Sequence, residues 1–488
     1  MKHSSASVFF SRKNFGLIFG LVVFLIFILL PAPEGLSPQA MRVAAVTLLM
    51  AIWWVTEALP IYATALAPMA LFPLLGVLEA QATAVNYGHH FILLLIGGFI
   101  IAAALERHGL HRRFALTTIK LIGASRRKLV LSFMLASAFL SMWIANVTVA
   151  LLMTPIAMAV LNRLENEQAD SRFGVALLLA IAYAANIGGV GTLIGTPTNL
   201  VLPGVLKSAF PDSLEITFFS WMAVGLPVVI ILLPVAFFYL IRYFSISGKA
   251  DDSPKIIQSQ LDALGAMNQA EKRVLIIFVL AAAGWIFRSD FQLGALEISG
   301  WASLLGVEKF VTDATVAIFF TMLLFALPSG VKQGERMMDW ETANRIPWGM
   351  GVLVGGGFAL AKAYSATGLA KWLGGQMTFL QNLPLLLTIL LIALFLIFFT
   401  EVNTNTGTAN IFLPVLASVA VAQNADPLLL LFPATFACSC VFCLPSGTGV
   451  NAVVFGSGKI TLPEMARCGF LLNIAGALLI GVVVYLMI

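Results

Sequence analysis

The chain has 488 residues, of which 60% are hydrophobic and only 10% are charged. Soluble domains carry about 25% charged residues, and runs of about 20 apolar residues are typical of membrane spans, so this composition excludes a soluble globular protein. The formal charge of +5 is small, and the Lys and Arg residues form no basic stripe that would indicate a nucleic-acid surface. We therefore expect an all-α integral membrane protein, surrounded by membrane lipid and without a nucleic-acid partner.

Hydrophobic runs bounded by charges or by Pro and Gly clusters predict about eleven transmembrane helices. In chain order they cover residues 15–31, 40–58, 61–79, 88–106, 173–206, 216–243, 272–288, 312–328, 347–365, 428–456 and 466–488. The first run follows basic residues, as in a signal peptide. It is long, however, and no A-x-A cleavage site follows in PAPEGLSPQ, so we expect an uncleaved first span.

The loops between these runs predict the orientation. Segments 107–128, 242–273 and 332–345 are basic, whereas segment 31–39 has neither Lys nor Arg. Lys and Arg are enriched in cytoplasmic loops. We therefore expect a protein of the plasma (inner) membrane with its N-terminus in the cytoplasm and its C-terminus outside.

Two further apolar stretches, residues 128–164 and 383–422, are polar in the middle. The first contains SMWIANVTVALLMTP and the second contains TEVNTNTGTANIFLP. Non-helical backbone at membrane depth is tolerated only where protein or a water-filled cavity lines it. Each stretch therefore predicts a re-entrant hairpin with a polar tip, rather than a simple span.

The same pattern occurs twice in the chain. Gly97–Phe99 recurs at Gly356–Phe358, and Asn146 in the first tip aligns with Asn405 in the second. Both pairs have the same offset, since 356 − 97 and 405 − 146 are both 259. One register held over so many residues indicates a duplication. Five predicted spans separate the hairpins, and this odd number predicts that the two repeats have inverted topology, as in many secondary transporters.

Each repeat also contains a motif that interrupts an apolar helix. GTPTN at Gly195–Asn199 aligns with GTGVN at Gly447–Asn451, at an offset of 252. A broken helix exposes carbonyl oxygens, which suit Na⁺, and N–H groups, which suit an anion. We expect the two tips and the two breaks to converge on one site.

The tips offer neutral oxygens and amides but no cation. Neither Lys nor Arg occurs within residues 133–161 or 372–422. Because an isolated charge in a low-dielectric site is very costly, a bound anion would need bound cations as its counter-charge. The tips therefore predict cation-coupled transport of an anion.

Other polar residues have structural interpretations as well as functional ones. Glu401 is either a pathway residue or a structural acid that pairs with the hairpin backbone. Cys438, Cys440 and Cys443 have a spacing that could suggest a metal site, but in an apolar helix without a nearby histidine we expect them to pack. His89 and His90 are expected at the outer membrane boundary.

At these motifs the sequence resembles the divalent anion/sodium symporter family, whose members carry dicarboxylates, tricarboxylates or sulfate. The family has two Ser-Asn-Thr tips, represented here by Ala145-Asn146-Val147 and Thr404-Asn405-Thr406. The segments WWVTEALPI, NIGGVGTLIGTPTN and CSCVFCLPSGTGVNAVV carry the rest of the resemblance, which extends along essentially the whole chain.

The resemblance implies two sodium sites and one substrate site. The first sodium site would use Ser141, Ala145, Asn146 and Gly195, and the second would use Thr400, Asn403, Asn405 and Gly447. Substrate oxygens would contact Asn146, Thr196, Thr404, Asn405, Thr406 and Thr448. Na⁺ would be the coupling ion, without an organic cofactor.

The resemblance also implies a homodimer whose transport domain moves like an elevator against a scaffold. The scaffold would consist of residues 15–106 and 272–365, and the transport domain of residues 128–243 and 383–488. Residues 1–14 would form a cytoplasmic N-terminus, and residues 244–271 a cytoplasmic linker.

Several residues depart from the family pattern. The first tip has Ala145 and Val147 in place of hydroxyl residues, and Thr198 and Gly449 stand where the family has prolines. The first half of the site is therefore less polar than the second.

The sequence predicts sodium-coupled symport of divalent anions, with C4-dicarboxylates such as succinate, malate or fumarate as the expected substrates. The alternatives are transport of sulfate or another anion, and sodium-independent exchange of dicarboxylates. An enzyme is not expected, because H-E-x-x-H, G-x-S-x-G and P-loop motifs are lacking. A channel is the other rival, which saturable, sodium-dependent uptake would exclude.

Overall fold

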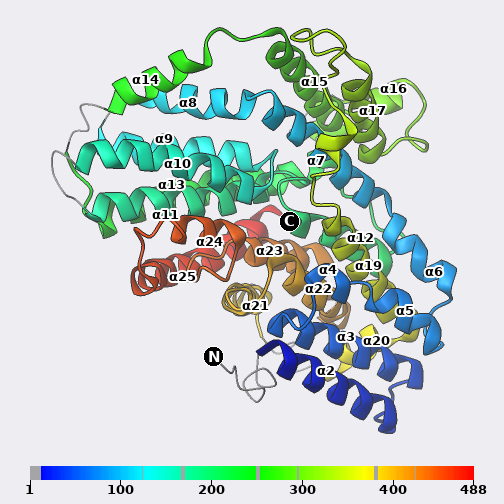
Figure 1. Ribbon diagram of the computed structural model, residues 1–488. Coiled ribbons are helices and arrows are strands. Elements are labelled where there is room, and N and C mark those ends of the chain that lie inside the picture. The colour runs from blue at the N-terminus through cyan, green and yellow to red at the C-terminus, as the bar shows by residue number, and fades with distance from the viewer. Residues whose placement is uncertain are drawn as a thin grey trace, which may run out of the picture.

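The computed structural model describes residues 12–123, 125–165, 171–248, 253–293, 296–377, 383–423 and 425–488. The regular elements of the described part are almost all α-helices (Figure 1). Most of the predicted N-terminal segment, and residues 249–252 of the predicted linker, lie outside the described residues.

Within the described residues, the first half of the chain forms twelve α-helices and two 3₁₀-helices. These are α2 (Arg12–Leu29), α3 (Pro38–Thr56), α4 (Ile61–Thr64), α5 (Ala67–Leu74), α6 (Ala80–Ala84), η1 (Val85–Gly88), α7 (His90–Arg107), α8 (Leu110–Ile122), α9 (Arg126–Ser141), α10 (Asn146–Glu165), α11 (Ser171–Gly188), η2 (Gly189–Gly191), α12 (Pro197–Ala209) and α13 (Phe218–Tyr243), as described.

The described residues of the second half add twelve α-helices and one antiparallel pair of β-strands. These are α14 (Ser253–Leu264), α15 (Gln269–Ile286), β1 (Phe291–Leu293), β2 (Leu296–Ile298), α16 (Trp301–Leu304), α17 (Asp313–Ala326), α18 (Trp340–Ala343), α19 (Gly349–Thr367), α20 (Leu369–Gln376), α21 (Leu385–Thr400), α22 (Asn405–Gln423), α23 (Pro427–Ser439), α24 (Gly449–Phe455) and α25 (Leu462–Met487), as described.

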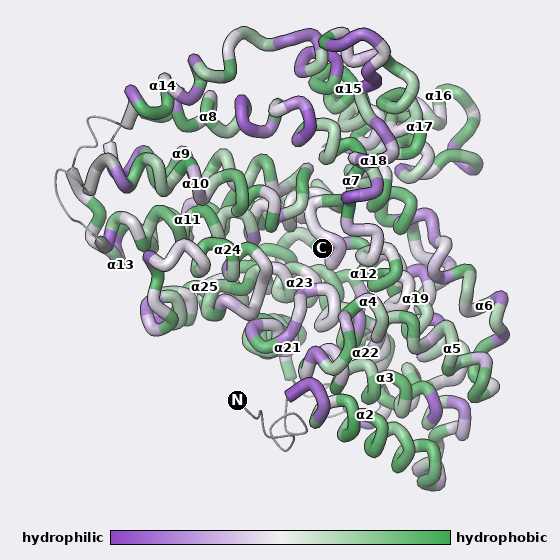
Figure 2. Tube along the Cα trace, in the orientation of Figure 1, coloured by the Kyte–Doolittle hydropathy of each residue, from purple (hydrophilic) through white to green (hydrophobic). Residues whose placement is uncertain are grey.

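Hydrophobic residues run along most of these helices, and hydrophilic residues concentrate at helix ends and connections (Figure 2). Six described helical segments are long and apolar enough to cross a membrane, and further apolar helices are shorter. Outward-facing apolar side chains remain exposed, among them Phe15 and Leu29 on α2. Such a surface is costly in water but suits the hydrocarbon of a bilayer.

The duplication seen in the sequence recurs in the helix lengths. Helices α9 and α21 both have 16 residues, and α13 and α25 both have 26. A capping box begins each of the long pair, at Thr217 for α13 and at Thr461 for α25. Such a box satisfies N–H groups that have no partner inside the helix. The same local signals therefore end up at equivalent places in both halves.

The polar stretches interrupt their helices where the sequence predicts. Helix α9 ends at Ser141 and α10 begins at Asn146, while α21 ends at Thr400 and α22 begins at Asn405. The GT-x-x-N motifs break two more helices, since α12 begins at Pro197 and α24 begins at Gly449. How these breaks lie relative to a membrane remains a prediction.

Some elements differ from the expectation. The single span expected over residues 61–79 is wrong, because α4 ends at Thr64 and a separate α5 begins at Ala67. Pro68, near the start of α5, explains the interruption, since it lacks the N–H that would bond to the carbonyl of Thr64 in a continuous helix. Helices α8 and α14 occupy segments that we assigned only to basic loops, and the β1–β2 pair was not foreseen.

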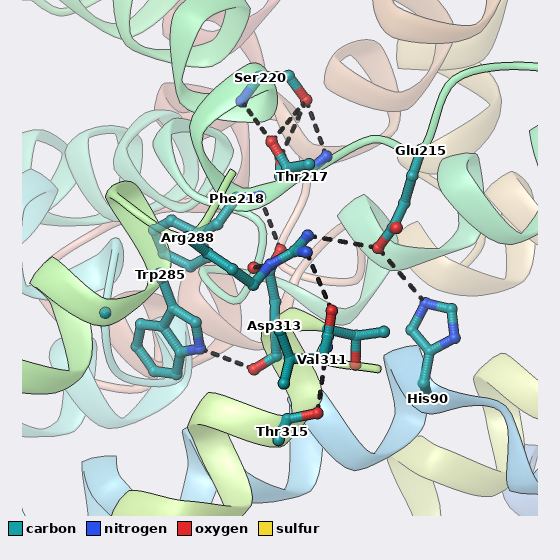
Figure 3. A network of polar contacts seen from close by, with 12 residues as sticks. His90, Glu215, Thr217, Phe218, Ser220, Trp285, Arg288, Val311, Asp313 and Thr315 are labelled. Atoms are coloured by element: carbon teal, nitrogen blue, oxygen red, sulfur yellow. Dashed lines mark hydrogen bonds and ion pairs between the residues drawn. The ribbon is translucent and has the colours of Figure 1, made fainter. Parts of the chain in front are cut away.

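A buried ion pair ties together the ends of three helices (Figure 3). Arg288 Nε lies 2.5 Å from Asp313 Oδ1, and both residues are almost fully buried, at 3% and 2% exposure. Asp313 Oδ2 also accepts a hydrogen bond of 2.8 Å from the Phe218 N–H at the start of α13. Glu215, whose side chain is 40% exposed, lies 3.5 Å from Arg288 at the rim. The pair thus fixes α13 and α17 beside the end of α15.

Replacement of one member of this pair should destabilise the protein strongly. Asp313→Ala would leave the Arg288 guanidinium buried without its carboxylate, at a cost of about 3–5 kcal/mol. Glu215→Gln is the matched control, because a partly exposed ion pair contributes only about 0–1 kcal/mol. Thermal unfolding in detergent should therefore show a large fall in apparent Tm for Asp313→Ala only. Equal shifts for both variants would contradict this account.

Candidate functional site

A cavity of about 280 Å³ lies where the two tips and the two broken helices meet. Helices α4, α7 and α19 complete its wall through Ile61, Phe99 and Leu353. All six residues predicted to contact substrate line this cavity: Asn146, Thr196, Thr404, Asn405, Thr406 and Thr448. Residues from four separate segments of the chain thus converge on one space.

The residues predicted to hold sodium divide into two groups. Ala145, Asn146, Gly195, Asn405 and Gly447 also line the cavity. Ser141, Thr400 and Asn403 lie behind it and are buried, at 0%, 0% and 4% exposure. The structure therefore brings both predicted sets to the same region, one at each tip.

At the first tip, a hydroxyl orients the central asparagine. Ser141 Oγ lies 2.6 Å from the carbonyl oxygen of Ala185 and also within hydrogen-bond distance of Asn146 Oδ1, and its one proton can be donated to either acceptor. The Asn146 amide lies so close to Gly189 that a Cβ at position 189 would be 2.8 Å from it. A side chain cannot fit there, so the tip packs directly against the backbone of the broken helix.

At the second tip, two amide oxygens are buried without a donor. Asn403 Oδ1 and Asn405 Oδ1 have no hydrogen-bond partner among the described residues. Nearly all buried polar atoms in proteins have a partner, so each exception calls for an explanation. Buried oxygens without donors are suitable ligands for a cation such as Na⁺. The second predicted sodium site therefore fits the ion that the resemblance implies.

Two asparagines hold the broken helices open in the same way. Asn199 and Asn451 each donate from Nδ2 to two backbone carbonyls of their own break, and they are related by the offset of 252. The accepting oxygens belong to Gly189 (2.9 Å), Thr192 (2.7 Å), Val441 (3.2 Å) and Leu444 (3.0 Å). The final residue of each GT-x-x-N motif is therefore structural, a role that the sequence pattern alone did not reveal.

Glu401 pairs with backbone rather than with a cation. Its carboxylate accepts hydrogen bonds from three successive N–H groups and from the Asn473 side chain, and the residue is 3% exposed. The distances are 3.0 Å from Phe442 N, 2.6 Å from Cys443 N, 2.8 Å from Leu444 N and 2.7 Å from Asn473 Nδ2. Of the two interpretations of this residue, the contacts favour the structural one.

The first repeat has no such carboxylate. Met142 occupies the equivalent position, since 401 − 142 is 259. Its side chain packs against Gly191, whose added Cβ would lie 3.0 Å from the Met142 methyl carbon. Apolar packing at one break thus replaces ionic hydrogen bonding at the other.

A second cavity of about 420 Å³ adjoins the first. The two share Phe99, Ala145 and Pro347, and the second extends to Arg107 and Arg345. Both arginines belong to or border segments predicted to be cytoplasmic. The second cavity therefore extends from the wall of the candidate site to the end of α7 that carries Arg107.

Comparison with known proteins finds a matching family model and similar transporters. Residues 11–487 match a family model described as the sodium:sulfate symporter transmembrane region. The chain is 42% identical to the sodium-dependent dicarboxylate transporter SdcS of Staphylococcus saprophyticus, covering 100% of this chain and 96% of the relative. It is also 42% identical to SdcS of Staphylococcus aureus, covering 99% of this chain and 93% of that protein.

Two solved structures share the fold at low sequence identity. The YdaH transporter of Alcanivorax borkumensis has a TM-score of 0.52 and 12% identity, covering 98% of this chain and 97% of that one. MtrF of Neisseria gonorrhoeae has a TM-score of 0.51 and 12% identity, covering 96% and 94%. At this identity the likeness concerns the fold alone.

The contacts of Glu401 predict a sharp difference between the two repeats. Glu401→Met, which copies the residue of the first repeat, would leave buried N–H groups without an acceptor, at about 1–3 kcal/mol for each group. Met142→Leu is the control, because volume-conserving apolar changes cost less than about 1.5 kcal/mol. We expect a large fall in apparent Tm for Glu401→Met alone. A Glu401→Met protein as stable as Met142→Leu would refute the structural role.

Proposed function

We propose that this chain, which belongs to the sodium:sulfate symporter family, is a sodium-coupled secondary transporter of divalent anions in the plasma membrane. C4-dicarboxylates such as succinate, malate and fumarate are the proposed substrates. The names of its relatives from both Staphylococcus species, which are sodium-dependent dicarboxylate transporters, support this choice.

One observation carries the proposal. The cavity is lined by side-chain amides and hydroxyls from both repeats, and no charged residue lines it in the described part of the chain. A dianion in such a space would lack a counter-charge from the protein, and burial of an unpaired charge is very costly. Bound cations would remove that cost, so substrate and sodium should bind together.

The proposed roles follow the positions of the residues. Ser141, Ala145, Asn146 and Gly195 would hold one sodium ion, and Thr400, Asn403, Asn405 and Gly447 would hold the other. Sodium, when bound, supplies positive charge at each tip. Asn146, Thr196, Thr404, Asn405, Thr406 and Thr448 would then bind the substrate oxygens. Both tip asparagines would serve ion and anion, because an amide offers an acceptor and a donor.

The wider architecture is part of the same proposal. We infer two inverted repeats with re-entrant hairpins, about eleven spans, and a homodimer that works by an elevator mechanism. Residues 15–106 and 272–365 would form the scaffold, and residues 128–243 and 383–488 would form the moving domain. Helix pairs of equal length at equivalent positions support the duplication. The cavity that leads to Arg107 and Arg345 is consistent with a cytoplasmic N-terminus.

Two alternatives within the same fold follow from the family and from the first tip. The description of the family model names sulfate. The first tip lacks hydroxyls at Ala145 and Val147, which favours a weaker first sodium site and, in the limit, sodium-independent exchange. Both alternatives can be tested together with the main proposal.

Uptake into proteoliposomes tests the function. Labelled succinate should enter only with an inward sodium gradient, and unlabelled dicarboxylates should compete better than sulfate. Asn405→Ala should weaken the apparent affinities for both sodium and succinate, because the Asn405 amide is proposed to bind both. Thr406→Ala is the matched variant in the same tip. Because it removes one buried hydrogen bond to the substrate, it should raise the half-saturating succinate concentration by about five-fold or more. The half-saturating sodium concentration should change little.

Succinate uptake that is equal with and without sodium, together with wild-type behaviour of Asn405→Ala, would refute symport and favour exchange. Sodium-dependent uptake of sulfate but not of succinate would refute only the substrate assignment.

A further inference from the structure

Each tip touches the broken helix of the other repeat, and the two contacts differ in polarity. In the second tip, Thr406 Oγ1 lies 3.1 Å from Thr198 Oγ1 of α12. Thr198 Oγ1 in turn lies 3.4 Å from Thr196 Oγ1, which lines the cavity. This end of the cavity therefore carries a chain of three hydroxyls.

The contact that the first tip makes with the broken helix of the other repeat is apolar. Val147 stands at the position of Thr406, since 406 − 147 is 259, and it faces Gly449 of α24. A Cβ at position 449 would lie 2.7 Å from Val147 Cγ2. Val147 therefore fills space that any residue larger than glycine would need. The two departures from the family pattern are thus partners in one contact.

Other residues extend this apolar end. Ala145 precedes the tip asparagine, and Phe99 and Pro347 line both cavities together with Ala145, which places them on the side of the first tip. Val147 itself is 39% exposed and lines the cavity. Asn146 Oδ1 lies within hydrogen-bond distance of Ser141 Oγ. The Val147 side chain itself offers a substrate hydroxyl no hydrogen-bond partner.

We propose that, among C4-dicarboxylates with a substituent, the cavity favours an apolar substituent over a hydroxyl, with one carboxylate at the hydroxyl chain of Thr406 and the substituent against Val147. This inference rests on the proposed function and specifies the substrate class of the same site. A methyl branch of the substrate beside Val147 is removed from water, and burial of such a group stabilises binding by about 0.8 kcal/mol. A hydroxyl at the same carbon loses its hydrogen bonds to water, so it binds less well.

Two ligands of similar shape, compared on the wild type and on one variant of similar shape, test the proposal. 2-Methylsuccinate and malate differ only by a methyl in place of a hydroxyl, and Val147→Thr makes the same exchange in the protein. Equilibrium binding to the purified protein in saturating sodium should give wild type a preference for 2-methylsuccinate of at least about five-fold. Val147→Thr should reduce that preference by at least about three-fold. Val421→Thr, on the far part of α22 and outside the cavity lining, should keep the wild-type preference.

The outcomes separate this inference from the proposed function. Succinate binding with equal affinities for 2-methylsuccinate and malate, or a preference for malate, would overturn the inference and leave the function intact. A wild-type preference that Val147→Thr does not change would overturn the role of Val147. If no dicarboxylate binds in sodium, the proposed function fails first and this inference fails with it. Should Val147→Thr not fold, the comparison of the two ligands in wild type still decides.

Discussion

An anion that leaves water for a protein cavity must find compensating charge or hydrogen bonds, because an isolated buried charge is very costly. In this chain the requirement falls on uncharged groups, since amides and hydroxyls line the described cavity. Interruption of the helices at the site adds free backbone N–H and carbonyl groups to these side chains. The breaks at Ser141–Asn146 and Thr400–Asn405, and the side chains that stabilise them, follow from this one constraint.

Interrupted helices expose backbone groups that need hydrogen-bond partners. The two halves of the chain provide some of these partners in the same way. Asn199 and Asn451 bind carbonyls at equivalent positions of the two breaks. The halves then diverge in chemistry. Glu401 binds three N–H groups where Met142 only packs, and Thr406 bonds Thr198 where Val147 packs on Gly449. Duplication thus supplies a symmetric frame, and substitution within it supplies an unsymmetrical cavity.

The sequence predicted the tips and the breaks because polar residues stand out inside apolar runs and recur in register. It missed what depends on contacts between distant segments. The pairing of Glu401 with residues 442–444 spans about forty residues, and the fit of Val147 to Gly449 spans about three hundred; no local pattern encodes either. Helix α8 was missed for another reason, because its basic residues masked an amphipathic helical period. The proline-rich segment 61–79 was misjudged because hydropathy alone ignores the missing N–H groups of proline.

The central claim is that a cation offsets the charge of an anion held by neutral groups. Its most direct test is the affinity of the purified protein for sodium, titrated at increasing succinate concentrations. Because linkage is reciprocal, succinate should tighten sodium binding by the same factor by which sodium tightens succinate binding. A sodium affinity that stays constant from zero to saturating succinate would contradict the account.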